Sequence, residues 1–145
     1  MKNWIMIVSL FLIPASAWCQ ASNASKIQAE GAYVAAVPAT DDNTAAYFTL
    51  KNPTDQAISL VGGNSSVAKK VEIHNHIHKD GQMKMVHLES LEIPAHGEVK
   101  LAPMGLHVML IGLKDSFRKA KSVELTLKFS DKTQLKIKAP IKAEE

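Results

Sequence analysis

The chain of 145 residues is long enough for one domain and too short for two of ordinary size. Its formal net charge of +3 is too small to indicate a nucleic-acid partner, and lysines that alternate with apolar residues are typical of a solvated sheet face. The single cysteine, Cys19, excludes an intramolecular disulfide.

The first residues have the layout of a secretory signal peptide. Lys2 supplies a positive charge, residues 4–13 form an apolar run, and Pro14 ends that run shortly before a group of small residues. A membrane-spanning helix needs about 20 apolar residues, so this run is too short to span a bilayer. The sequence therefore predicts an exported protein without a stable membrane anchor.

Cleavage is expected after Ala21, with Ala17 as the alternative. Cleavage after Ala21 gives a signal peptide over residues 1–21 and a mature domain over residues 22–145. It also removes Cys19, which excludes cysteine-based zinc sites and cysteine nucleophiles. A lipid-modified Cys19 is a lesser alternative, because the bulky tryptophan directly before it makes a poor lipobox.

The remainder of the chain is predicted to form many short strands, which favours a single-domain, all-β, antiparallel β-sandwich. The predicted strands cover residues 27–37, 45–51, 57–62, 68–78, 82–88, 98–102, 107–113, 122–130 and 133–141. Turn-forming residues such as Asp80-Gly81 separate them, and residues 115–120 could hold one helical turn. No long helical pattern, internal repeat or second domain is apparent.

One stretch, residues 71–113, holds every histidine of the chain and four of its six methionines. These ten residues are His74, His76, His78, His87, His96, His107, Met83, Met85, Met104 and Met109. The other two methionines, Met1 and Met6, lie in the export segment. Such a concentration of imidazole and thioether groups predicts a metal site.

Strand geometry places many of these side chains on one face. If Asp80-Gly81 forms the centre of a hairpin, residues whose numbers sum to 161 lie opposite each other. His76 then faces Met85, while His74 and Met85 are diagonal neighbours with backbones about 7–8 Å apart. The same register pairs His78 with Met83 and His74 with His87. His107 and Met109 share one face of a later strand, because alternate residues of a strand point the same way.

The residue types indicate copper. Thioethers are soft and neutral and suit Cu(I), imidazole suits copper in either oxidation state, and structural zinc sites rarely use methionine. Neutral ligands leave the charge of the ion uncompensated, which favours transfer over permanent storage. Near the turns, Met104 and His96 are more simply interpreted as surface or packing residues, and His78 as a solvated hairpin residue.

The spacing of these residues resembles that of the periplasmic copper chaperones called PCuAC. That family has a histidine, ten residues, a methionine, twenty-one residues, and then His-X-Met, which His74, Met85, His107 and Met109 reproduce. The surrounding V-E-I-H, I-P-A-H-G and H-V-M-L-I-G-L-K segments are also similar. The resemblance implies a cupredoxin-like β-sandwich in the periplasm that binds one Cu(I) through these four residues. It also implies delivery of copper to the binuclear centre of cytochrome c oxidase, through the copper-centre subunit or its assembly factors.

Three features depart from the family pattern. His76 stands where the family often has methionine, P-M-G-L precedes His107 where P-G-G-Y is frequent, and the chain lacks a His- and Met-rich tail. Because His76 lies directly opposite Met85 in the hairpin register, it is the expected auxiliary or substitute ligand. The extra histidines, His76, His78 and His87, could also form a weaker Cu(II) site.

The protein is not expected to be an enzyme, since no general acid/base pair, activated nucleophile or phosphate loop is apparent. Two other interpretations remain open. The same ligands could sequester copper for tolerance, or the chain could be an exported binding module whose His-rich hairpin is incidental.

Overall fold

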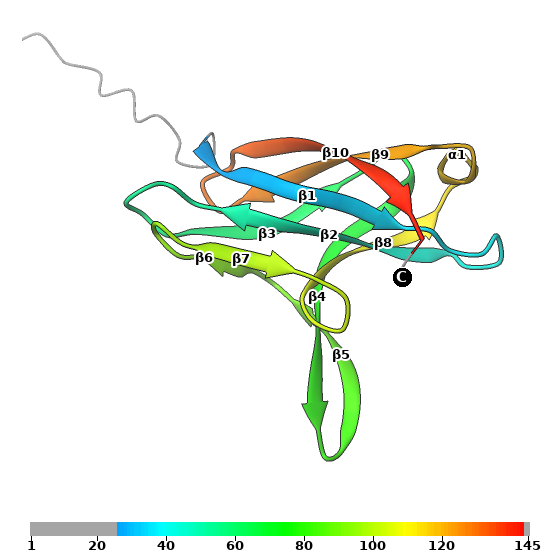
Figure 1. The fold of residues 1–145 in the computed structure, drawn as a ribbon, viewed down its shortest axis with the longest axis horizontal. Helices are drawn as coiled ribbons and strands as arrows, with labels where there is room; N and C mark the ends of the chain where they lie inside the picture. Colours follow the sequence, from blue (N-terminus) through cyan, green and yellow to red (C-terminus); the bar gives the residue numbers. More distant parts are fainter. Residues whose placement is uncertain (1–25, 144–145) are drawn as a thin grey trace, which may run out of the picture.

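The computed structural model describes residues 26–143 (Figure 1). It contains ten strands and one short helix. The elements are β1 (Gln28–Ala35), β2 (Asn43–Lys51), β3 (Ile58–Asn64), β4 (Ala68–Lys79), β5 (Gln82–Leu88), β6 (Leu91–Ile93), β7 (Glu98–Leu101), β8 (His107–Leu113), α1 (Asp115–Arg118), β9 (Ser122–Phe129) and β10 (Gln134–Lys142). The proposed signal peptide and its cleavage positions lie outside the described residues. No helix in the described part of the chain has the length and hydropathy needed to cross a membrane.

The strands form an all-β sandwich, as predicted, and its edges join into a barrel. Hydrogen bonding follows the order β5-β4-β8-β2-β1-β10-β9-β3-β6, and β7 pairs with β2. A contact between Gly63 of β3 and Val71 of β4 closes the path. Gly63 must be glycine here, because a Cβ atom would lie 2.7 Å from the backbone oxygen of Thr126.

The antiparallel prediction is wrong for one pair of strands. Strands β1 and β10 run parallel, with Val34 opposite Ile141 and Ala35 opposite Lys142. A tight hairpin forces its two strands to be antiparallel, whereas these two are separated by the whole domain and only their packing sets their direction. The alternation of apolar and polar residues along a strand gives no information on the direction in which it pairs with a distant strand.

The hydrophobic core explains which face of each strand carries the polar ligands. Alternate residues of β4 and β8, including Ile73, Val108 and Leu110, are almost fully buried and belong to the core cluster. Burying one such side chain contributes about 1.5–3 kcal/mol. Because side chains alternate along a strand, the residues between them must point to the opposite face. That second face holds His74, His107 and the residues around them.

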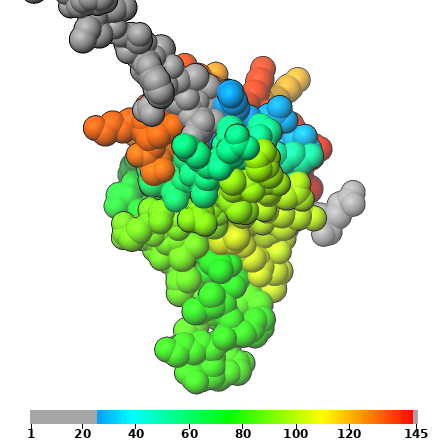
Figure 2. Space-filling view, turned by 90° about the vertical axis from the view of Figure 1, so that its left-hand side faces the viewer, coloured from blue at the N-terminus to red at the C-terminus, as the bar shows by residue number. Residues whose placement is uncertain are grey.

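The β4–β5 hairpin projects from the barrel (Figures 1 and 2). Its turn has positive φ angles at Asp80 and Gly81, as a two-residue hairpin turn of type I′ requires. The predicted register is confirmed: His76 lies opposite Met85, and His74 lies opposite His87. Beyond His74 the ladder between β4 and β8 ends, so the outer half of β4 has β5 as its strand partner.

Most predicted strands agree with the structure to within two residues at each end, and the helical turn is α1. Strand β6, Leu91–Ile93, was not predicted, because three residues are too few to show alternation. A buried polar network supports the nearby loop. The Asn52 side chain donates hydrogen bonds to the carbonyl oxygens of Gln56 and Ile93, and its oxygen accepts from the Thr54 backbone N–H and hydroxyl.

Candidate metal centre

Three adjacent strands bring the predicted ligands together. His74 in β4 lies directly opposite His107 in β8 on one side and His87 in β5 on the other. The ring centroids of His74 and His107 are 5.9 Å apart, and those of His74 and His87 are 5.5 Å apart. The three imidazoles thus form a row across the sheet on the face opposite the core.

The two methionines flank this row. Met109 lies two residues after His107 on β8, directly opposite Glu72 of β4. Met85 lies on the projecting hairpin, diagonal to His74, and 46% of its surface is exposed. His74, His107 and Met109 therefore occupy neighbouring positions of the sheet, and Met85 approaches from the hairpin side.

His107 is held as a neutral imidazole with one nitrogen available. Only 3% of its surface is exposed, and its Nδ1–H donates a hydrogen bond to the carbonyl oxygen of Gly105, 3.0 Å away. Burial lowers the pKa of His107, the Gly105 carbonyl partly opposes this, and His76 and His74 lower it further. At neutral pH the Nε2 atom of His107 therefore carries a lone pair that can bind a metal.

His74 is also partly buried and oriented by a neighbour. Its Nε2 atom lies 3.0 Å from Oε2 of Glu72, and this hydrogen bond is the main reason that the pKa of Glu72 is lowered. The Nδ1 atom of His74 is buried and has no hydrogen-bond partner in the described part of the chain. Buried polar atoms are nearly always paired in proteins, so an unpaired one beside other ligands is consistent with a site for an absent ion.

His76 lies as close to the row as the predicted ligands do. Its ring stacks on His107 with centroids 5.0 Å apart and planes 26° apart, and its Nδ1 atom is likewise buried and unpaired. It also lies directly opposite Met85. These contacts place His76 where the sequence expectation of an auxiliary ligand requires it, beside His107 and Met85.

The remaining candidates lie outside this group. His78 and Met83 form the next pair toward the hairpin tip, and 39% of the surface of Met83 is exposed. His96 pairs with Asp55 through an Nε2–Oδ1 distance of 2.5 Å, and Met104 is 67% exposed. The surface interpretation of His96 and Met104 agrees with these positions.

Within residues 26–143, no three histidine, cysteine, aspartate or glutamate side chains are grouped so that they alone could hold a metal ion. Met85 and Met109 lie beside the imidazoles, so the candidate donors on this face include thioether sulfur as well as imidazole nitrogen. Such a donor set suits Cu(I) and not zinc or magnesium.

Two groups that orient the histidines, the Glu72 carboxylate and the Gly105 carbonyl, were not predicted from the sequence. Glu72 precedes His74 by two residues, so strand parity could have placed both on one face. The Gly105 carbonyl could not have been found this way, because backbone conformation before β8 decides where that oxygen points.

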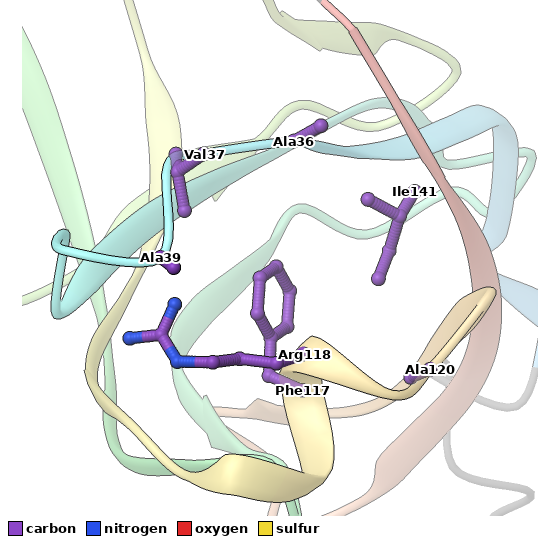
Figure 3. Close-up of a pocket in the computed structure, with 7 residues that line it drawn as sticks. All are labelled: Ala36, Val37, Ala39, Phe117, Arg118, Ala120 and Ile141. Carbon is purple, nitrogen blue, oxygen red and sulfur yellow. The ribbon is translucent and has the colours of Figure 1, made fainter.

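A pocket elsewhere in the molecule lacks metal-binding side chains (Figure 3). It lies between α1 and the end of β10 and is lined mainly by apolar residues such as Phe117 and Ile141. Arg118 at its margin donates hydrogen bonds to the carbonyl oxygens of Pro38 and Asp41. The candidate metal centre is thus a sheet face and not this pocket.

The fold is that of PCuAC domains, in agreement with the fold that the resemblance found in the sequence implies. The chain aligns with a copper-bound PCuAC domain from PmoF2 with a TM-score of 0.67 over 82% of this chain and 94% of that one. The identity of 23% establishes a shared fold alone. Apo-DR1885 from Deinococcus radiodurans is 35% identical, covers 99% of this chain and 97% of its own, and has a TM-score of 0.62.

The chain belongs to the LpqE-like family, whose model, described as "Putative lipoprotein LpqE-like", matches residues 27–141. A relative named "Putative lipoprotein Lxx21020" from Leifsonia xyli subsp. xyli is 34% identical over 131 residues, which are 90% of this chain and 78% of that protein. A structure of DR1885 with Cu(I) is 40% identical over 79% of this chain and 76% of that one, with a TM-score of 0.60.

Proposed function

We propose that this protein binds one Cu(I) ion through His74, Met85, His107 and Met109 and passes it to an acceptor protein in the periplasm. The observation that carries the proposal is the unpaired, buried Nδ1 atom of His74 beside His107, on the sheet face that Met109 shares. A buried nitrogen without a partner is costly unless an ion binds to it. The DR1885 structure with Cu(I) supports the choice of metal.

The donor set favours exchange of the ion. All four ligands are neutral, so none of them compensates the charge of copper. Met85 is half-exposed on a hairpin that projects from the barrel, where an acceptor can reach it (Figure 2). One ligand can therefore leave without disturbing the core. This arrangement supports a metallochaperone more than a storage protein.

The expected acceptor is the copper-centre subunit of cytochrome c oxidase or one of its assembly factors. Export of this chain is supported by its signal-peptide-like start and by the lipoprotein descriptions of its family and its relative. An exported chaperone meets copper proteins that fold outside the cytoplasm. Methionine suits such a compartment because, unlike cysteine, it does not enter disulfide exchange.

Competition between the apo-protein and a chromophoric Cu(I) chelator tests the ligand set. We expect one Cu(I) per chain. Replacement of Met85 or Met109 by leucine should weaken binding about tenfold or more, equivalent to about 1.4 kcal/mol. Leucine has nearly the same volume, so stability should change by less than about 1.5 kcal/mol. Met83→Leu and Met104→Leu are matched controls that should bind as the unmodified protein does. Equal binding by all four variants would refute the proposal.

A transfer experiment separates delivery from sequestration. Cu(I)-loaded protein is mixed with the soluble copper-binding domain of an oxidase subunit, and the copper centre is followed by its absorption. Delivery predicts that the acceptor is filled faster than free chelated copper fills it. Retention of copper by this protein, together with copper sensitivity but normal oxidase activity in a deletion strain, would instead identify sequestration. Absence of any preference for Cu(I) over Ni(II) would favour a binding module with an incidental His-rich hairpin.

A further inference from the structure

Glu72 and His74 form a pair that the four-ligand set does not include. They lie two residues apart on β4, so both point to the ligand face, and Glu72 is directly opposite Met109. Oε2 of Glu72 and Nε2 of His74 are 3.0 Å apart, and the side chain of Glu72 is about a third exposed. The carboxylate therefore contacts a proposed copper ligand and also reaches solvent.

The chemistry of this contact determines which nitrogen of His74 carries the proton. An ionised carboxylate can only accept hydrogen bonds, so Nε2 of His74 must be the donor. A neutral imidazole has one N–H group, which leaves Nδ1 of His74 with a lone pair and no proton. That atom is buried and has no hydrogen-bond partner among residues 26–143.

His107 has the opposite arrangement. Its Nδ1–H donates to the Gly105 carbonyl oxygen, which leaves the lone pair on Nε2. Two different acceptors, one carboxylate and one backbone carbonyl, thus fix the two imidazoles in opposite tautomers. The rings lie 5.9 Å apart on adjacent strands, and each keeps one nitrogen available to an ion.

We propose that Glu72 is a positioning residue that holds His74 in the Nε2–H tautomer, so that His74 binds Cu(I) through Nδ1 while His107 binds it through Nε2. This inference rests on the proposed function, because it deepens the description of the same site. The Nδ1 atom is nearer to the backbone than Nε2, so the ion lies close to β4. The carboxylate also adds one negative charge beside an otherwise neutral set of ligands.

A second carboxylate provides a matched control. Glu89 lies near His87, with 3.8 Å between its Oε1 and Nδ1 of His87, and its side chain is 96% exposed. The distance is too long for a hydrogen bond. Glu89→Ala therefore removes the same charge beside a histidine of the row without removing a tautomer-fixing contact.

Long-range ¹H–¹⁵N correlation spectra of histidine-labelled apo-protein at pH 7.5 test the tautomers directly. We expect His74 as the Nε2–H form and His107 as the Nδ1–H form. Glu72→Ala should remove the tautomer preference of His74, whereas Glu89→Ala should leave it unchanged. Addition of Cu(I) should shift Nδ1 of His74 and Nε2 of His107. A Nδ1–H tautomer for His74 in the unmodified apo-protein, or a copper-induced shift at its Nε2, would overturn the inference.

Affinity measurements supply an independent readout. Loss of a partner that orients a metal-ligating histidine typically weakens metal binding by about 10–100-fold, which is the loss expected for Glu72→Ala. Glu72→Gln keeps an acceptor oxygen and should lose less affinity than Glu72→Ala, and Glu89→Ala should bind as the unmodified protein does. Equal losses for Glu72→Ala and Glu89→Ala would show a charge effect alone and refute positioning. If the unmodified protein binds no Cu(I), the proposed function fails, while the apo spectra still decide the tautomer.

Discussion

Bound copper should stabilise the pairing of strand β5 with β4, and Met85 should be the ligand on β5 that provides this stabilisation. Strand β5 pairs with β4 alone, from Ile73 opposite Leu88 to Lys79 opposite Gln82. An opening that lifts β5 separates Met85 from the ligands on β4 and β8 but leaves those three ligands in place. The protein with β5 opened should therefore bind Cu(I) with the affinity of a Met85→Leu variant.

This thermodynamic cycle gives the expected size of the change in the free energy of opening β5. With copper saturating, the free energy of opening β5 rises by the binding free energy that Met85 contributes. If Met85→Leu weakens binding about tenfold, the hydrogen-bonded amides of β5 should exchange about tenfold more slowly in the copper-loaded protein, equivalent to about 1.4 kcal/mol. The slowing of exchange and the loss of affinity should thus be equal.

Hydrogen–deuterium exchange of the apo and Cu(I)-loaded forms measures the first quantity, under conditions where exchange follows the population of the open hairpin. Met85→Leu should abolish the slowing for residues 82–88. Met83→Leu should retain it, because Met83 lies on the same strand and face but one pair nearer the tip. Amides of the turn between β9 and β10 should exchange at the same rate in the apo and Cu(I)-loaded forms. A tenfold loss of affinity in Met85→Leu without any slowing of β5 exchange in the unmodified protein would refute the reasoning.

Three further predictions concern the ligands and the fold. His74→Ala should weaken Cu(I) binding about tenfold or more, and His76→Ala by less than about threefold, in the chelator competition. Asn52→Ala should lower the free energy of unfolding in urea by about 2–3 kcal/mol without changing Cu(I) affinity, because buried partners on Ile93 and Thr54 lose their hydrogen bonds. The apo-protein should lose stability as pH falls below about 6.5, because the unfolded chain protonates His107 at its ordinary pKa while burial keeps the folded side chain neutral.

Each of these has a contrary outcome. A larger loss for His76→Ala than for His74→Ala would assign the ligand position to His76, which the stacked contact with His107 makes the natural substitute. An unchanged urea midpoint of unfolding for Asn52→Ala would mean that the loop between β2 and β3 rearranges without loss of stability. The pH effect of His107 should end once pH falls below its folded pKa and should be absent above pH 6.5. A His107→Gln variant with the same pH dependence as the unmodified protein would contradict it.

Much of the fold follows from short-range patterns in the sequence. Alternation located most of the strands, and the Asp80-Gly81 turn fixed the register of β4 against β5, because a two-residue turn leaves no freedom in the pairing. The direction of β10 relative to β1 and the closure at Gly63 could not be predicted. They depend on how distant segments pack, and no local pattern encodes that packing.

The sequence by itself determined which residues could bind copper and that the hairpin residues share one face, because residue chemistry and strand parity are local properties. Only the tertiary structure decided that β8 lies beside β4, with His107 opposite His74. It also decided that the Gly105 carbonyl accepts a hydrogen bond from Nδ1 of His107. The first contact joins strands far apart in the chain, and the second depends on where one backbone oxygen points, so no local pattern in the sequence encodes either.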